Sequence, residues 1–474
     1  MKKLAIGIST LFIFNISYGV ERISLQEAVE RALYNNYELK ASKKQLEAKK
    51  YEYLATKGMK YPTLKFGEIF MRTNVPGWAM MNLLNQERLT IQNSAWFVDM
   101  TAFNSPMFTF PSPSYPEVNN FQTKFEVNLP LYTGGKIETG IEMRKKDYEA
   151  TKKDVKRTEQ KVIYDVSRAY YGALLAKRAI SLAKQAIKSA KKHYRTAKLM
   201  YETGLTIKAD VLRARVYLEE ARAKLKEAQS QYLTAKKGLL LAMGVDDVKP
   251  EDIEIVGELD FEDTPRGIDY WQSVALENRP DLKAIQERVE IAKKMEEFTK
   301  ADLKPTVGAF ASYEWDDKDF PVLGDGGSWW TAGVALNWKL FDGYQTLNKQ
   351  KAAREMYKKY RHQEKGFEEY IKFKVYEAYQ KLQSAKAKVR TAQKNRRWAR
   401  EVLKVTETRY KNQLATMIDL IDTQTLYDKT GFDLARAIYE AKMSLLNLKY
   451  EAGVLNLDTI DKYLDGDYKK GGDK

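Results

Sequence analysis

The sequence predicts an α+β chain made of two tandem repeats, each with a pair of β-strands followed by a long antiparallel helical hairpin. Three observations predict this fold class. The decapeptide YETGLTIKAD at residues 201–210 reappears as YKNQLATMID at 410–419. Several segments alternate between apolar and polar residues, and the stretches 131–249 and 322–474 contain no proline. A repeated unit of this length is too long for a solenoid, so we expect a duplicated chain.

Two alignment registers relate the halves. At an offset of 243, ALYNNYELKA (32–41) aligns with ALENRPDLKA (275–284). At an offset of 209, LYTGG (131–135) aligns with LFDGY (340–344), and the match continues without a gap for over a hundred residues. The change of offset means that the first half carries 34 extra residues between Pro62 and Leu131.

The chain begins with an export signal and a capped helix. Two lysines precede an uncharged stretch of 13 residues, LAIGISTLFIFNI, and small residues follow it. This pattern is typical of a secretory signal peptide over residues 1–19, with the mature chain starting at Val20. Ser24 and Glu27 then form a predicted capping box at the start of the first helix.

The alternating segments predict strands. In 121–131, Phe121, Thr123, Phe125, Val127, Leu129 and Leu131 share one face, and the residues between them are mainly polar. The segment 330–340 alternates in the same way, and 62–71 and 305–315 do so more weakly. A period of two over about ten residues, with aromatics near the ends, suits strands of a membrane-spanning barrel. A soluble sandwich or sheet alternates equally well.

The proline-free stretches predict coiled-coil helices. Small and apolar residues recur at spacings of four and three over 162–201 and again over 371–410, with Arg396 as the one break. A helix from Lys136 to Glu202 would be about 100 Å long at 1.5 Å per residue. Helices of this length must pack side by side, so each run is expected to reverse and return antiparallel.

The two decapeptides are the predicted turns of these hairpins. Gly204 can adopt the positive φ that ends many helices, and Asp210 and Asp419 are placed to cap the returning helices. Gln413 replaces Gly204 in the second copy, so we expect the second turn to have a different shape.

Composition narrows the class of function. The net charge is +16, but the charges are interspersed, so nucleic acid is not an expected partner. Without cysteine there are neither disulfides nor thiolate metal sites. His193 and His362 are expected to be solvated surface residues, and no metal, cofactor or catalytic constellation is predicted. No run after the signal peptide approaches 18 apolar residues, so a membrane crossing would have to come from strands.

The strand number has a consequence for assembly. Four strands cannot close a barrel, because spanning barrels start at eight strands and open edges are not tolerated in hydrocarbon. Three copies would supply twelve strands and twelve long helical segments, which suffice for a barrel continued by a hollow ring of helices.

The doubled strand pairs and hairpins, LPLYTGG matched by WKLFDGY and the two tyrosine-to-aspartate tips resemble those of the TolC-like outer membrane efflux proteins. The resemblance covers essentially all of the mature chain. It implies a homotrimer with a twelve-stranded barrel in outer membrane lipid and an α-helical barrel in the periplasm. It also implies a periplasmic adaptor, which docks on the tips and links the channel to an inner-membrane pump.

With this resemblance the chain divides into five parts. The signal peptide (1–19) is followed by the first repeat (20–245), an inter-repeat equatorial segment (246–268), the second repeat (269–454) and a C-terminal equatorial tail (455–474).

The resemblance also implies roles for residues at the tips. The adaptor-contacting set is Gly204, Leu205, Gln413 and Leu414, and the periplasmic gate comprises Asp419, Asp422, Tyr410 and Asp210. Ala415 stands where the family usually has an arginine, so the family's lock between protomers is expected to differ here. On the residues alone, Asp419 and Asp422 would be a helix cap and part of a solvated face.

The extra residues belong to the first strand pair. Segment 72–120 contains five prolines and is expected at the outer mouth of the barrel, either as a lid or as a surface loop. Two other classes of function stay open, a periplasmic coiled-coil adaptor or structural protein and a passive outer membrane porin.

Overall fold

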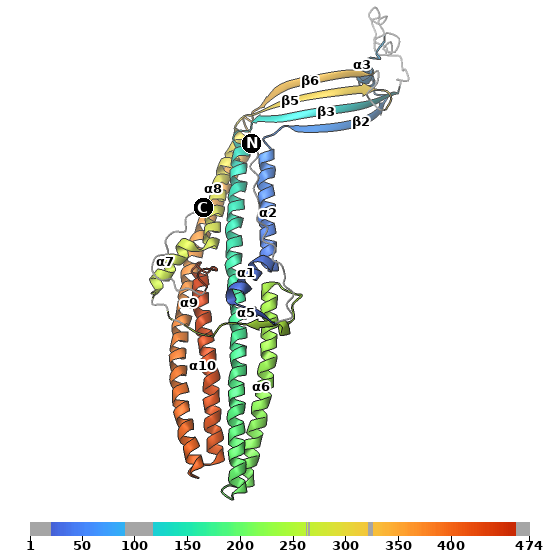
Figure 1. Cartoon of the computed structure of the whole chain (residues 1–474). Coiled ribbons are helices and arrows are strands. Elements are labelled where there is room, and N and C mark those ends of the chain that lie inside the picture. Colours follow the sequence, from blue (N-terminus) through green and yellow to red (C-terminus); the bar gives the residue numbers. More distant parts are fainter. Residues whose placement is uncertain (1–19, 91–116, 262, 264–265, 321–325, 461–474) are drawn as a thin grey trace, which may run out of the picture. The chain divides into compact units, whose positions relative to one another are not determined.

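The structure is a computed structural model that describes residues 20–90, 117–261, 263, 266–320 and 326–460. The predicted signal peptide, residues 91–116 of the long loop and the end of the tail lie outside the described residues. The chain forms two compact units, and each unit takes segments from both predicted repeats (Figure 1).

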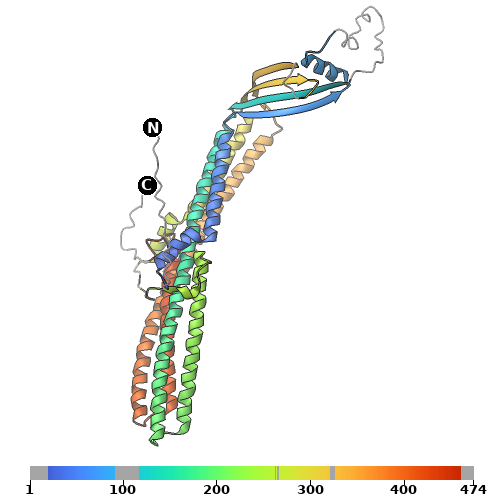
Figure 2. The same ribbon diagram turned by 45° about the vertical axis from the view of Figure 1, so that its right-hand side comes forward.

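The first unit consists of residues 1–46, 151–285 and 364–474 and is mainly helical. Its elements, two of which begin outside it, are β1 (Glu21–Ile23), α1 (Leu25–Asn35), α5 (Lys136–Glu202), α6 (Lys208–Met243), β4 (Ile253–Ile255), α7 (Ile268–Asn278), α9 (Gln345–Lys411) and α10 (Met417–Glu451). Helix α5 has the predicted limits, and adding 209 to them gives the limits of α9. The predicted helical hairpins, α5–α6 and α9–α10, are therefore confirmed (Figure 2).

The predicted coiled-coil positions are buried or half-buried, except Tyr201, which is 45% exposed. Val166 and Ala173 on α5 and Val375 and Leu382 on α9 are at most 1% exposed. The break at Arg396 has a local cause, because its guanidinium stacks 3.5 Å from the centre of the Tyr427 ring. A cation–π contact thus replaces apolar packing at this position.

The start of the chain is attached to the middle of the sequence. Strand β1 pairs in parallel with β4, so Glu21 lies opposite Ile253. Helix α1 begins with the predicted capping box, in which Glu27 accepts from the backbone N–H of Ser24 at 2.8 Å. Both elements belong to a core shared with α5 and α6.

The second unit consists of residues 47–150 and 286–363 and carries the main sheet. Its elements are the later part of α2 (Tyr37–Gly58), β2 (Thr63–Thr73), α3 (Pro76–Asn85), β3 (Val118–Tyr132), the first turns of α5, most of α8 (Pro280–Lys300), β5 (Thr306–Asp317), β6 (Gly327–Asn337) and the first turns of α9. The strands are antiparallel in the order β2-β3-β5-β6 (Figure 1).

The strand register separates the two predicted faces. Phe66, Phe125, Tyr313 and Trp330 lie opposite one another across the four strands, and this row belongs to an aromatic face. The neighbouring row of Lys65, Glu126, Ser312 and Thr331 belongs to a polar face. The alternation is confirmed with two exceptions. A register shift between Pro130 and Tyr132 interrupts it at Leu131, and β6 ends at Asn337, so residues 338–340 of the predicted strand lie beyond it.

The duplication is preserved in the sheet. Phe66 pairs with Phe125 in the first hairpin, and Ala309 pairs with Val334 in the second. These pairs are related by the two sequence offsets of 243 and 209, so both hairpins have the same register. Among the described residues, no helix combines the length and apolar content needed to cross a membrane.

Candidate functional site: the two hairpin tips

Both tips end their first helix with the same hydrogen-bond pattern. In the first tip, the Leu205 N–H donates to the Met200 carbonyl at 2.7 Å and the Gly204 N–H to the Tyr201 carbonyl at 3.0 Å. In the second, Leu414 and Gln413 make the equivalent bonds at 2.8 and 3.0 Å. This is a Schellman motif, which needs a left-handed residue at its fifth position.

The second turn therefore does not have the different shape expected from Gln413. Its φ is 61°, close to the 73° of Gly204, although a side chain disfavours this conformation. The two bonds of the motif and the packing of the returning helix hold Gln413 there. The expectation was wrong because the same two backbone bonds form in both turns, and they outweigh a local preference of about 1 kcal/mol.

The residues predicted to contact an adaptor are exposed at these turns. Leu205 is 53% exposed and Leu414 66% exposed, and Gly204 and Gln413 are exposed beside them. Both leucines are large apolar side chains at the extreme end of a hairpin. Such residues suit contact with another protein.

The two predicted caps behave differently. Asp419 forms a capping box with Thr416, accepting from its backbone N–H at 2.8 Å and its hydroxyl at 2.7 Å. These bonds, the backbone one first, lower the pKa of Asp419. Asp210 instead accepts from the Thr206 hydroxyl at 2.5 Å, and the residue at the start of α6, Ile207, has no side-chain cap. The capping expectation holds for Asp419 and is wrong for Asp210.

Tyr410 brings the two tips together inside one chain. Its ring is 4% exposed and packs with Ala197 and Ala214 of the first hairpin, and its hydroxyl has no hydrogen-bond partner among the described residues. Burial, and then the nearby charge of Asp210, raise its pKa to about 12. Tyr410 and Asp210 are thus neighbours without a direct bond. Asp422 lies apart from them on the exposed face of α10.

A polar chain that sequence reasoning missed links three helices above the tips. His193 Nε2 on α5 lies 3.1 Å from the Gln424 Oε1 on α10. The Gln424 amide donates to Asp428 Oδ1 at 2.9 Å, and the Tyr217 hydroxyl on α6 donates to Asp428 Oδ2 at 2.9 Å. We call these four residues the buried polar chain. Its hydrogen bonds connect α10 of the second hairpin to α5 and α6 of the first.

His193 is therefore not the surface residue expected from its charged neighbours. It is 3% exposed, and burial lowers its pKa, so the ring is neutral at pH 7. Burial also raises the pKa of Asp428. The sequence did hold a signal, because residue 193 is four positions before the buried Ala197 on one helix face. His362 is exposed, as expected.

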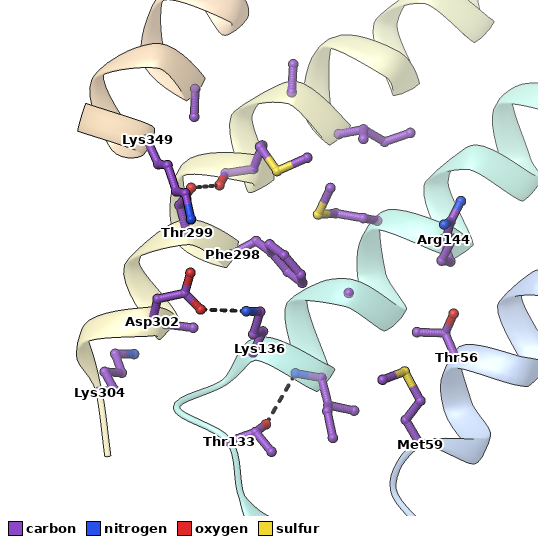
Figure 3. Close-up of a pocket in the computed structure, with 18 of the residues that line it drawn as sticks. Thr56, Met59, Thr133, Lys136, Arg144, Phe298, Thr299, Asp302, Lys304 and Lys349 are labelled. Atoms are coloured by element: carbon purple, nitrogen blue, oxygen red, sulfur yellow. Dashed lines mark hydrogen bonds and ion pairs between the residues drawn. The ribbon is translucent and has the colours of Figure 1, made fainter. Parts of the chain in front are cut away.

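A second candidate surface lies in the other unit, where the strands meet the helices. It is a pocket of about 1540 Å³ lined by the strand-proximal ends of α2, α5, α8 and α9 (Figure 3). Thr306 and Asn337 line it and pair with each other on the polar face of the sheet, so the pocket opens on the polar side.

The pocket combines an apolar wall with basic groups. Lys136 Nζ lies 5.2 Å from the centre of the Phe298 ring and pairs with Asp302 (Figure 3). The apolar lining includes Met59, Ile137, Met143, Ile291, Met295, Phe298 and Met356, and the charged lining Lys136, Arg144, Arg288, Lys304, Lys339, Lys349, Asp147 and Asp302. Such a lining suits an amphiphilic molecule that carries a negative charge.

Comparison with known proteins identifies the family. The profile of the outer membrane efflux protein family matches residues 28–245 and 271–453, which is most of the chain. The chain therefore belongs to this family of outer membrane efflux channels, and it is a channel protein rather than an enzyme. The search of curated proteins finds no match.

Solved structures share the fold at low sequence identity. The outer membrane protein VceC of Vibrio cholerae is 15% identical, with a TM-score of 0.69 over 90% of this chain and 96% of that one. The CmeC channel of Campylobacter jejuni is 15% identical, with a TM-score of 0.71 over 91% and 85%. The open-state MtrE channel of Neisseria gonorrhoeae is 16% identical, with a TM-score of 0.70 over 91% and 89%.

Proposed function

We propose that three copies of this chain form the channel-tunnel of a tripartite efflux or type I secretion system. In this assembly the sheets close into a twelve-stranded barrel in the outer membrane, and the hairpins form a helical tunnel in the periplasm. Substrates then pass from an inner-membrane pump and a periplasmic adaptor to the exterior.

The observation that carries this proposal is the four-stranded sheet. One face carries aromatic and aliphatic side chains, many of them exposed, such as Phe66, Trp330 and Leu336. Within the described part of the chain, β2 and β6 each pair on one side only. An apolar face suits lipid, and in lipid each free edge requires a strand from another copy because unpaired backbone groups cost several kcal/mol, about the cost of an unmade buried hydrogen bond.

The tips supply the docking and gating parts of the proposal. Leu205 and Leu414 beside Gly204 and Gln413 would contact the adaptor through apolar packing. Tyr410 and Asp210 would hold the second hairpin against the first near the closed end. Ala415 packs beside this cluster and cannot replace an arginine's hydrogen bonds, so closure would depend on apolar contact and on the buried polar chain.

Asp419 and Asp422 would form the negative constriction. Both are exposed and lie three residues apart on α10, so they share a face of the helix. In a three-fold ring each position would bring three carboxylates together, which would attract cations. The capping bonds favour the charged form of Asp419, and mutual repulsion in the ring would oppose them.

Planar-bilayer recording on the detergent-purified protein tests this function. The wild type should form channels that prefer cations and are blocked by divalent or trivalent cations. Asp419→Asn and Asp422→Asn should weaken both properties, whereas Glu219→Gln, an exposed acidic change on the first hairpin, should not. A mature chain that is monomeric, soluble without detergent and unable to permeabilise liposomes would disprove the assignment.

A further inference from the structure

Helix α3 lies in the longer connection of the first repeat, between β2 and β3, and it packs on one particular face of the sheet. Asn82 Nδ2 on α3 lies 3.8 Å from the sulfur of Met71, which pairs with Asn120 on the polar face. The ring nitrogen of Trp329 donates to the Asn85 carbonyl at 2.8 Å. Trp329 is an odd-numbered residue of β6, like Thr331, and shares the polar face. Helix α3 therefore covers polar, not aromatic, sheet surface.

Buried polar groups fix α3 in this place. Gln86, which follows α3 directly, is 1% exposed and donates to the Asn119 carbonyl and to Asn120 Oδ1, both at 2.7 Å. Asn120 in turn donates to Asp316 Oδ1 at 2.6 Å. Asp316 is fully buried. Displacing α3 would break the hydrogen bonds of Gln86 to the sheet and disrupt the polar network that ends at Asp316.

Apolar packing and close backbone contact complete the attachment. Ala79 and Leu83 on α3 form a small core with Val118 of β3. A side chain at Gly327 would overlap the Asn85 carbonyl oxygen, so this approach of α3 to β6 requires glycine. Helix α3 thus contacts β3, β5 and β6 and reaches β2 through Met71, which distinguishes it from a loosely attached surface loop.

The opposite side of α3 is an exposed apolar ridge. Trp78, Met81 and Leu84 are spaced by three residues and are 59%, 49% and 45% exposed. The ridge lies at the end of the sheet where β2 leads to β3 and β5 leads to β6, whereas α2, α5, α8 and α9 all join the strands at their other end.

We propose that α3 is a fixed apolar constriction inside the outer mouth of the barrel, and this inference rests on the proposed trimeric channel. In that channel the polar face lines the lumen and the end of the sheet remote from the helices is the outer mouth. Three α3 ridges then face one another across the pore. An apolar constriction resists hydrated ions by dewetting, while an apolar or amphiphilic cargo can pass along it.

Single-channel recording tests the constriction. The triple variant Trp78→Ser/Met81→Ser/Leu84→Ser should raise the conductance for small ions on the order of twofold, because polar groups wet the pore. The matched variant Trp78→Phe/Met81→Leu/Leu84→Met keeps the ridge apolar and should retain the wild-type conductance. Equal conductance in all three proteins would overturn the proposal.

A second measurement does not depend on the triple variant folding. The chain has no cysteine, so Met81→Cys places a unique thiol on the ridge. A charged thiol reagent added from the outer side should change the current at once. The control is Arg72→Cys, at the same end of β2 but on the aromatic face, which should give no change.

The outcomes separate the two proposals. If the wild type forms no channel, the proposed function fails. If it forms channels whose current is insensitive to the ridge substitutions or to modification at position 81, only the constriction fails.

Discussion

The first hairpin tip, at residues 201–210, and the second, at 410–419, have the same backbone turn in different surroundings. Tyr201 is 45% exposed, whereas its equivalent Tyr410 is 4% exposed against the first hairpin. Asp419 caps its helix, whereas Asp210 binds a threonine hydroxyl outside the helix start. His193 is buried, and the residue 209 positions later, Val402, is 47% exposed.

This difference shows which tip contacts form within a single chain. Tyr410 of the second hairpin packs against the first hairpin. Tyr201 of the first hairpin has no equivalent neighbour among the described residues. In a closed ring its neighbour would be the second hairpin of an adjacent copy. The positions equivalent to Ala197 and Ala214 there are Thr406 and Thr423, so that contact would be more polar.

The largest effect is expected from the two tyrosines. Tyr410→Ala removes a buried ring and should lower the free energy of opening of the second tip by about 2–3 kcal/mol, measured by amide hydrogen exchange. Tyr201→Ala is the matched change and should cost less than about 0.5 kcal/mol. Equal losses would show that an adjacent copy buries Tyr201 as fully as its own chain buries Tyr410.

The next largest loss of stability is expected from a change in the buried polar chain. Asp428→Ala leaves the Tyr217 hydroxyl and the Gln424 amide without an acceptor and should cost about 2 kcal/mol in thermal unfolding followed by helical circular dichroism. Glu219→Ala, the equivalent change 209 residues earlier at an exposed position, should be close to neutral. If Asp428→Ala leaves the thermal stability unchanged, water replaces the hydrogen bonds of the buried polar chain without loss of stability.

The two turn residues should respond in opposite directions. Gly204→Gln forces a side chain into positive φ and should destabilise the first tip by about 1 kcal/mol, because nothing else crowds that position. Gln413→Gly should stabilise the second tip by about 0.5 kcal/mol. Hydrogen exchange at each tip measures both, and changes of the same sign would contradict a purely conformational cause.

The smallest expected effect is a pH dependence of stability that arises from His193, where α5 contacts α10. Burial lowers the pKa of His193 from 6.5, and the charges of Glu407 and Asp428 only partly oppose this shift. As the pH falls below 6.5 the unfolded chain binds a proton that the folded chain does not, so stability is full above pH 6.5 and is lost as pH falls through the lowered pKa.

The matched variants for this prediction are the two histidines. His193→Gln should flatten the dependence of the melting temperature between pH 7 and pH 5, and His362→Gln at an exposed site should preserve it. If both variants retain the wild-type slope, groups other than His193 cause the acid sensitivity.

Periodicity was enough to predict most of the fold, but not most of the site. The limits of α5, the positive φ of Gly204 and the two sheet faces follow from spacing and residue type alone. The burial of His193 and the bonds of Asp428 depend on which helices become neighbours, and that is a tertiary property. The position of helix α3 could not be predicted, because proline and tryptophan in a long insertion indicate an ordered segment but not the surface that it covers.

If copies associate through the sheet edges as proposed, the pairing inside the sheet predicts which residues meet at the junction. Strand β3 pairs with β5 inside the chain, and Phe125 lies opposite Tyr313. The duplication maps β3 onto β6 at an offset of 209 and β5 onto β2 at 243, so Val334 of one copy would meet Phe70 of the next, both on the aromatic face. Cysteines at these two positions would then link neighbours into a covalent three-chain ring, and a pair shifted by one residue would not.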